Sequence, residues 1–336
     1  MRVSVVLCTY NRAAHLPNVL DGLARSVMPA TADWEVLVVD NNSSDETASV
    51  ANDFAEKYPA QFRYVFEKRP GKSHALNTGV REARGDVIAF LDDDVTLEPT
   101  WLRNLTLPLE SGDWAGVGGR TILAEQFSPP AWLALEGPHR MGFALAALFD
   151  EGNEAHELRE PPFGANMAYR KKCFERCGLF RTDMGPSPDR DVPRPNEDTE
   201  FGRRVIAAGG RICYEPSAVV YHPVPSDRIR KEYFLRWWFD AGRAQIREIG
   251  RRPDILGIQR RYWAITKIVL AVVSVRALRW IVSFDPAKRF FRKCMVWLTA
   301  GQIAEIYRQW GAAREADSTA GAIERLDSAT ETLATR

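Results

Sequence analysis

Three short apolar runs, separated by helical patterns, constrain the fold of this 336-residue chain most strongly. The runs are VSVVLC at 3–8, EVLVVD at 35–40 and DVIAFLD at 86–92. Each is too short for a helix, rich in Val and Ile, and closed by polar residues, which is typical of buried parallel strands. The order predicts a βαβαβ arrangement and therefore an α/β fold, in which ligands bind beyond the carboxyl ends of the strands.

The pattern becomes less regular after residue 100. AGVGGRTI at 115–122 predicts a further strand with close backbone approach, and RVIAAGGRIC at 204–213 predicts the end of a helix followed by a strand. The Pro-rich stretch at 181–196 predicts a loop long enough to act as a lid.

Polar residues follow each of the first three runs, as CTYN, DNNSSD and DDD. Side chains alternate along an extended chain, so Asp92 and Asp94 are expected to point one way and Asp93 the other. Two carboxylates on one side form a hard-oxygen site suited to Mg²⁺ or Mn²⁺. A solvated acidic turn is the alternative interpretation. A structural Ca²⁺ loop is disfavoured because no spaced D-x-D-x-D-G pattern follows.

Five ordered segments resemble those of family 2 glycosyltransferases. They are VSVVLCTYNR, VLVVDNNSSDET, GKSHALNTGVREARGDVIAFLDDDV, GANMAYRKKCFERCGLF and NEDTEFGRRVIAAGG, and the resemblance covers residues 1–222. It implies a GT-A fold, which is a Rossmann-like nucleotide-binding domain with a mixed, mainly parallel sheet flanked by helices, here over 1–225. It also implies a nucleotide-sugar donor, such as a UDP- or GDP-sugar, a divalent metal ion, and transfer with inversion.

Matched residue by residue, the resemblance also implies the donor-side residues. Asp94 would bind the metal ion, Mn²⁺ or Mg²⁺, with His222 near the metal or the diphosphate. Asp40 would bind the base, and Asp92 would face the ribose. The residues with an implied nucleotide-binding role are Thr9, Arg12, Asp40, Lys72, Asp92 and Asp93.

A second acidic cluster lies in PNEDTEFGRRV, where capping of a helix N-terminus is the structural alternative. The resemblance implies a general base here, for which Asp198 is our first choice and Glu197 the second. A sugar hydroxyl is a weak nucleophile, so a carboxylate must take its proton as it attacks. On the acceptor side, the resemblance implies roles for Gly164 and Asn166, and Trp132 could stack on an acceptor ring.

The C-terminal part carries the opposite charge from the rest of the chain. Residues 1–225 hold 24 Lys and Arg against 32 Asp and Glu, a net charge of −8, whereas residues 226–310 hold 18 against 7, a net charge of +11. The latter segment is also rich in aromatic residues, and we expect a helical extension. It would either lie in an anionic membrane surface or pack on the core. The polar tail at 311–336 is expected to be mobile.

These features also bear on partners and location. The longest uncharged apolar run, at 268–275, is too short for a conventional spanning helix, which needs about 20 residues. The five scattered cysteines favour a reducing compartment, and we expect a cytoplasmic location at the inner face of the cell membrane. No nucleic-acid-binding module is recognisable, so nucleic acid is not an expected partner.

The sequence therefore predicts a metal-dependent, inverting glycosyltransferase that acts on a saccharide or lipid-linked acceptor. One alternative is a sugar nucleotidyltransferase, which would want a Gly-rich phosphate loop after the first strand, and CTYNR contains no glycine. The other is an inactive nucleotide-sugar-binding module in a membrane assembly.

Overall fold

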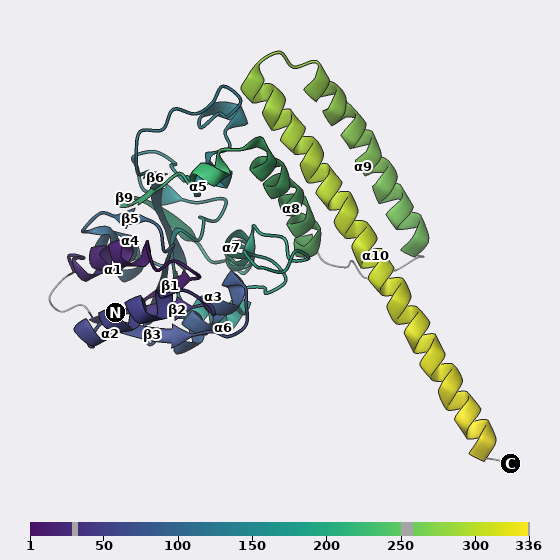
Figure 1. Ribbon diagram of the computed structural model, residues 1–336, viewed down its shortest axis with the longest axis horizontal. Coiled ribbons are helices and arrows are strands. Elements are labelled where there is room, and N and C mark those ends of the chain that lie inside the picture. Colours follow the sequence, from purple (N-terminus) through teal and green to yellow (C-terminus); the bar gives the residue numbers. More distant parts are fainter. Residues whose placement is uncertain (29–32, 250–257, 335–336) are drawn as a thin grey trace.

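The computed structural model describes residues 1–28, 33–249 and 258–334, and it shows an α/β unit with long helices along one side (Figure 1). The strands are β1 (Arg2–Thr9), β2 (Asp33–Asp40), β3 (Phe62–Phe66), β4 (Val87–Leu91), β5 (Thr96–Leu97), β6 (Gly116–Leu123), β7 (His156–Glu157), β8 (Asn166–Arg170) and β9 (Ile212–His222). The α-helices are α1 (Leu16–Ala24), α2 (Thr47–Lys57), α3 (Lys72–Glu82), α4 (Trp101–Ser111), α5 (Gly142–Ala146), α6 (Lys171–Cys177), α7 (Glu197–Ala207), α8 (Lys231–Ile249), α9 (Ile258–Ile281) and α10 (Pro286–Ala334).

The strands form one mixed sheet in the order β3-β2-β1-β4-β8-β6-β9-β5, with β7 paired to β9. The four strands from β3 to β4 are mutually parallel, which confirms the predicted α/β fold. Strands β1, β2 and β4 match the three apolar runs. Strand β3 was not predicted, because FRYVF is mostly half-buried and therefore lacks a continuous apolar run.

The register of the parallel strands brings their polar ends to one edge of the sheet. Thr9 at the end of β1 pairs with Asp40 at the end of β2, and Leu7 pairs with Leu91 at the end of β4. The residues that follow these strands therefore gather at the same edge, as the sequence predicted.

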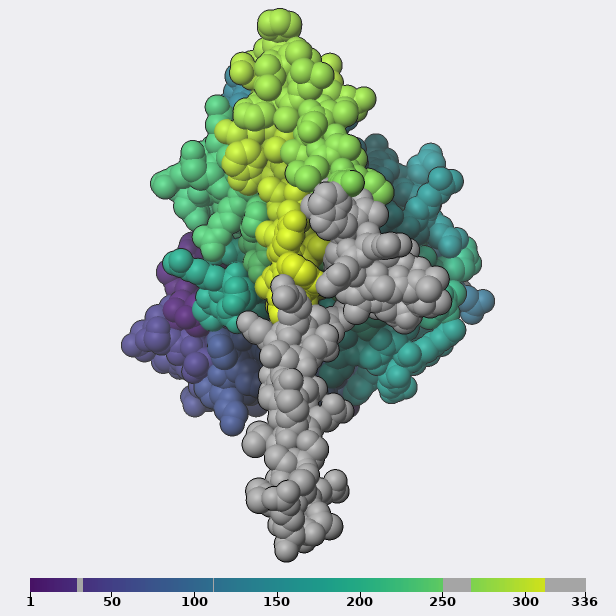
Figure 2. All heavy atoms as spheres, turned by 90° about the vertical axis from the view of Figure 1, so that its right-hand side faces the viewer, coloured from purple at the N-terminus to yellow at the C-terminus, as the bar shows by residue number. Residues whose placement is uncertain are grey.

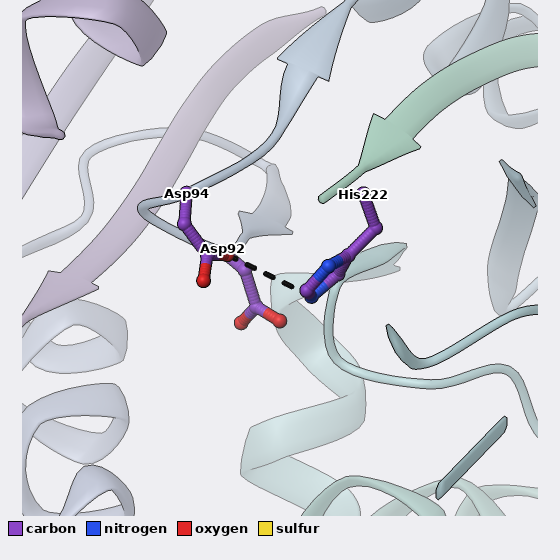
Figure 3. A group of neighbouring side chains, drawn as sticks. All are labelled: Asp92, Asp94 and His222. Carbon is purple, nitrogen blue, oxygen red and sulfur yellow. Dashed lines mark ion pairs between the residues drawn. The ribbon is translucent and has the colours of Figure 1, made fainter. Parts of the chain in front are cut away.

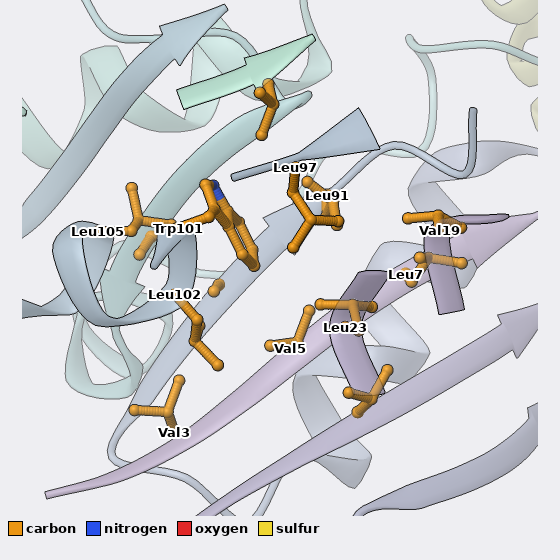
Figure 4. Close-up of a cluster of buried hydrophobic side chains, with 14 of the residues drawn as sticks. Val3, Val5, Leu7, Val19, Leu23, Leu91, Leu97, Trp101, Leu102 and Leu105 are labelled. Atoms are coloured by element: carbon orange, nitrogen blue, oxygen red, sulfur yellow. The ribbon is translucent and has the colours of Figure 1, made fainter. Parts of the chain in front are cut away.

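The core lies on both faces of the sheet because successive side chains of a strand point to opposite sides. Val3, Val5 and Leu7 of β1 pack with the apolar sides of α1 and α4 (Figure 4). Val6 points to the other face, where it packs with residues of α3, α6 and α7. Burial on both faces explains why β1 reads as a continuous apolar run.

The C-terminal helices pack on the α/β unit and on one another. A separate apolar cluster joins α5, α8 and the first turns of α10. Helices α8 and α10 approach closely at two glycines: a Cβ on Gly242 would lie 1.9 Å from the Leu298 carbonyl oxygen, and one on Gly301 would lie 1.9 Å from that of Phe239. Helix α9 lies along the other side of α10 (Figure 1). The predicted helical extension is thus anchored on the core through α8 and α10.

Two further expectations concern the C-terminal part. Among the described residues, none of the helices is both long enough and apolar enough to cross a membrane. Residues 311–334 continue α10, while 335–336 lie outside the described residues, so the mobility of this tail stays a prediction.

Candidate active site

A cavity of about 880 Å³ opens at the edge of the sheet where β1 and β4 end. One wall comes from these strand ends and from the start of α3. A second wall comes from the loop before α7 and the first turn of that helix. Side chains of α5 and α8 complete the lining. The cavity therefore lies where an α/β sheet binds its ligands.

Cations offset the repulsion within the Asp92–Asp94 triplet. Lys72 Nζ, at the first position of α3, lies 2.6 Å from Asp92 Oδ1. Arg12, which follows β1, lies 3.8 Å from Asp93 and 3.5 Å from Asp94. All five side chains line the cavity, as does Thr9. The structure thus brings five of the six predicted nucleotide-binding residues to one wall.

The three carboxyl groups do not share one electrostatic environment. Burial raises the pKa of Asp92, but the Lys72 charge and hydrogen bond, together with the charges of His222 and Arg228, lower it by more, so the net shift is downward. Burial raises the pKa of Asp93 to about 6, and the Asp94 charge contributes to the increase while Arg12 opposes it. Asp92 is therefore held ionised, which is the form that binds cations.

Asp92, Asp94 and His222 converge in a group that could hold a metal ion (Figure 3). One ligand atom from each residue lies within 4.8 Å of the others, and His222 Nε2 lies 3.7 Å from Asp94 Oδ1. His222 ends β9 and is buried, and its Nδ1 lies 2.7 Å from the Pro223 carbonyl oxygen. A proton on Nδ1 would leave the Nε2 lone pair facing the carboxylates. Two carboxylates and one imidazole fit a divalent cation such as Mn²⁺.

Glu197 and Asp198 begin α7 at the second wall. Asp198 Oδ2 accepts the backbone N–H of Gly164 at 2.5 Å, and its Oδ1 accepts that of Thr199 at 2.7 Å. Burial raises the pKa of both carboxyl groups, and the Asp198 charge raises that of Glu197 further, while Lys72 opposes both shifts. Two carboxyl groups whose pKa values are displaced, at a cavity wall, are candidates for proton transfer.

Three residues expected at the site lie elsewhere. Asp40 is buried and accepts hydrogen bonds from Ser43 N and the Tyr64 hydroxyl, both at 2.9 Å, and the neighbouring Asn41 lines the cavity in its place. The amide of Asn166 is fully used inside the fold. It accepts from Trp101 Nε1 and donates to two backbone carbonyl groups.

Trp132 is the third residue that lies away from the cavity. Its ring packs edge-to-face on Phe234 and Phe290, with centroid distances of 5.6 and 4.8 Å. The half-buried ring therefore belongs to the apolar cluster between the α/β unit and the C-terminal helices, and it does not line the cavity.

An aromatic wall that the sequence did not predict lines the acceptor-side part of the cavity. Phe143 of α5 lies 5.5 Å from Trp237 and 5.7 Å from Trp238, centroid to centroid, and stacks on Phe163 at 6.3 Å. Arg236 lines the same side. In the sequence, Arg236, Trp237 and Trp238 belong to the RWWFD segment at 236–240. The spacing of this segment does not reveal which side of the helix faces the cavity.

The loop predicted at 181–196 contributes Pro186, Ser187 and Arg194 to the cavity wall and is held from behind by α8. Arg247 donates to the carbonyl oxygens of Asp183 and Asp191, both at 2.5 Å. Arg243 donates to Asp191 at 2.6 Å.

Glu305 of α10 joins the two arginines behind this loop. Its carboxylate is buried and lies 2.9 Å from Arg247 and 3.5 Å from Arg243. The carboxylate thus compensates the charge of both side chains, and α10 helps to position the cavity wall.

Comparisons with known proteins agree with this architecture. A mannosyltransferase of Pyrobaculum calidifontis, solved with GDP-mannose and Mn²⁺, superposes with a TM-score of 0.54 at 20% identity, over 96% of this chain and 80% of its own. GalNAc-T7, solved with UDP, GalNAc and Mn²⁺, gives the same TM-score at 14% identity, over 76% and 52% of the two chains. These likenesses confirm the predicted GT-A fold.

Sequence relatives and a family model identify the chain further. Succinoglycan biosynthesis protein ExoM of Rhizobium meliloti is 26% identical over 79% of this chain and 80% of its own length. A glucosyl-dolichyl phosphate glucuronosyltransferase of Haloferax volcanii is 28% identical over 71% and 75%. The model of glycosyl transferase family 2 matches residues 4–178, which is more than half of the chain. The chain therefore belongs to glycosyl transferase family 2 and is a glycosyltransferase.

Proposed function

We propose that this enzyme transfers a sugar from a nucleotide-diphosphate sugar to a hydroxyl group of its acceptor, with inversion at the anomeric carbon and with a divalent cation. The observation that carries the proposal is the presence of two separate acidic groups in the lining of one cavity. Asp92 and Asp94 lie at the end of β4, and Asp198 lies at the start of α7. A direct displacement needs both, because charge must be stabilised on the leaving group while the attacking hydroxyl loses its proton.

On the donor side, Asp92, Asp94 and His222 would hold Mn²⁺ or Mg²⁺. When bound, the ion would supply positive charge that stabilises the leaving diphosphate. Lys72 and Arg12 add two fixed cations on the same wall, which suits phosphate oxygens. Thr9 and Asp93 would complete the nucleotide pocket.

On the acceptor side, Asp198 would accept the proton of the attacking hydroxyl group. Its hydrogen bonds from Gly164 and Thr199 fix the carboxylate in place. A base held at a fixed position promotes the reaction because less entropy is lost when the hydroxyl group and the base reach the reactive geometry. Glu197 is the second candidate for this role. Attack from the side opposite the leaving group inverts the anomeric centre.

The aromatic wall suits the acceptor, because sugar rings pack on aromatic faces while their hydroxyl groups stay hydrogen-bonded. We propose a saccharide or lipid-linked saccharide as the acceptor. The names of the two relatives above, one in succinoglycan biosynthesis and one acting on a glucosyl-dolichyl phosphate, support this class. A lipid-linked acceptor would place the enzyme at the inner face of the cell membrane.

The test is a panel of UDP- and GDP-sugars with Mn²⁺, in which nucleoside diphosphate release and donor binding are both measured. We expect release with one donor. We also expect Asp198→Asn to lower turnover by roughly 10²–10⁴-fold while donor binding is retained. Asp189→Asn, on the exposed part of the 181–196 loop, is the matched control.

The alternatives give different results in this experiment, or in a parallel one with a sugar phosphate and a nucleoside triphosphate. Donor binding without release would favour an inactive binding module. Formation of pyrophosphate from a sugar phosphate and a nucleoside triphosphate would indicate a nucleotidyltransferase. Unchanged turnover in Asp198→Asn would remove this residue from the role of base.

A further inference from the structure

Helix α9 carries a row of apolar side chains that are exposed in the part of the chain that the structure describes. Ile268, Val272, Val275, Leu278 and Val282 recur at spacings of three and four residues and are 39–64% exposed, so they form one row along the helix and its end. Phe284, in the turn before α10, is 97% exposed. Figure 2 looks onto this side of the molecule and shows α9 at its surface. We call this row, together with Phe284, the α9 ridge.

The opposite side of α9 is fixed to α10 by polar and aromatic contacts. Arg276 donates to the Met295 carbonyl oxygen at 3.1 Å and to the Thr299 hydroxyl at 2.6 Å. Lys293 lies over the rings of Trp280 and Trp297, at 5.4 and 5.3 Å from their centroids. The ridge is therefore presented outward by a rigid pair of helices.

Positive charge predominates in the segment that carries the ridge. Residues 258–304 contain nine Lys and Arg but a single acidic residue, Asp285. Arg279 and Arg289 are exposed beside the ridge. Arg292 donates to the Arg279 carbonyl oxygen at 2.8 Å and to the Ser283 hydroxyl at 2.6 Å, which fixes a further cation at the same turn.

This combination selects one class of partner. A second copy of the chain would bring the same cations against one another across a two-fold contact, which disfavours a dimer through this side. An anionic bilayer offers the complement of both features, since its acyl region accepts apolar side chains while its phosphate groups attract cations.

We propose that the α9 ridge binds the surface of an anionic membrane, with α9 in the plane of the interface and Phe284 inserted below the phosphate groups. Helices α10 and α8 then separate the membrane from the α/β unit, in the order in which Figure 1 shows them. This surface goes beyond the proposed function, because it requires no particular donor or acceptor.

The test is sedimentation of the full chain with vesicles of phosphatidylcholine, with and without phosphatidylglycerol. We expect binding only when phosphatidylglycerol is present, and weaker binding as salt is raised. The variant carrying Leu278→Asp and Phe284→Asp should lose roughly tenfold or more of its vesicle partition coefficient, because two apolar contacts are removed. Val27→Asp, at an apolar side chain that is 51% exposed on the α/β unit, is the matched control and should bind like the wild type.

The results separate this proposal from the function of the cavity. Circular dichroism should show that the ridge variant is folded. Its diphosphate release should equal that of the wild type, since neither substituted residue lines the cavity. Binding by the ridge variant at the wild-type level, equal binding to neutral vesicles, or no binding by the wild type would each overturn the proposal. A dimer in sedimentation velocity that the ridge variant abolishes would assign the ridge to a second copy and overturn it too.

Discussion

Gly164 donates its backbone N–H to Asp198 Oδ2 at 2.5 Å, so that a glycine of the cavity wall sets the position of the proposed base. A Cβ on Gly164 would lie 3.1 Å from the same oxygen and 3.4 Å from the Asp198 Cβ. We expect Gly164→Ala to displace the carboxylate and to lower kcat by roughly tenfold to a hundredfold. Donor affinity should stay nearly unchanged, because the donor-side carboxylates lie at the other wall.

The measurement is kcat together with the Kd for the donor. Gly311→Ala is the matched control, since a Cβ there meets no atom within 4 Å and the position is helical. An unchanged kcat in Gly164→Ala would show that this hydrogen bond does not position the base.

The Glu197 charge is expected to affect the pH dependence of turnover. A base must be unprotonated, so turnover is lost as the pH falls through its pKa. Burial raises the Asp198 pKa, and Lys72 and the Asp92 carboxylate act on it in opposite directions. Burial and the Asp198 charge raise the pKa of Glu197 to about 8, so Glu197 is still neutral where Asp198 ionises. Glu197→Gln should therefore keep the acidic limb of the kcat profile and remove any inflection near the Glu197 pKa.

The profile of each enzyme is measured from acidic to mildly basic pH, so that it spans the Glu197 pKa of about 8, with the exposed Glu232→Gln as the control. The Glu197 variant also tests the assignment of the base. If it loses turnover at every pH while Asp198→Asn keeps it, Glu197 is the base and the order of the two candidates is reversed.

The metal proposal predicts a specific loss of affinity in His222→Ala. Removal of the imidazole deletes one of three candidate ligands, and we expect Mn²⁺ affinity to fall at least about tenfold. Isothermal titration of the metal-free protein with Mn²⁺ measures this directly. His139→Ala is the control, because that ring packs on Phe291. Equal Mn²⁺ affinity in both variants would exclude His222 as a ligand.

Glu305 is expected to control stability as well as the cavity wall. It lies 2.9 Å from Arg247 and 2.5 Å from Arg308, and Glu305→Gln would leave the buried Arg247 guanidinium group without its carboxylate partner. We expect this variant to lose about 3 kcal/mol of unfolding free energy in urea titrations. Glu232→Gln, on the exposed side of α8, should be close to neutral.

A comparison of the wild type with Glu305→Gln also gives a prediction for the pH dependence of stability. Burial raises the pKa of Glu305, but hydrogen bonds and charges from Arg308 and Arg247 lower it by more, so the folded-state pKa is below the unfolded value. The contribution to stability is complete above the unfolded pKa and is lost as the pH falls through the folded one. Between neutral pH and the range below about pH 4, the wild type should therefore lose more stability than Glu305→Gln. Parallel losses would contradict the assignment.

The sequence predicted those parts of the site whose residues would be unfavourable without a specific role or environment. Three adjacent carboxylates repel one another and are kept only where cations or a ligand compensate them, which is why Asp92 and Asp94 could be recognised. The strands could be recognised for a similar reason, since buried parallel strands must be apolar on both faces.

Neutral side chains were harder to place, because their role depends on what packs against them. An amide such as that of Asn166 can hydrogen-bond either to a ligand or to other parts of the protein. Here it bonds to Trp101 and to two backbone carbonyl groups, and their positions cannot be read from the sequence. The aromatic wall could not be predicted either, because it depends on how α5 meets α8. The hydrogen bond from the Tyr64 hydroxyl to Asp40 likewise joins two strands, β3 and β2, whose pairing the sequence did not predict.

The contact between Glu305 and the arginines of α8 sets the shortest part of the chain that we expect to be active. The family match ends at residue 178, and a protein truncated after β9 would still contain each proposed catalytic and metal-binding side chain. Such a fragment would lack the helices that hold the carbonyl oxygens of Asp183 and Asp191. Expression boundaries and domain exchanges should therefore be drawn beyond residue 305.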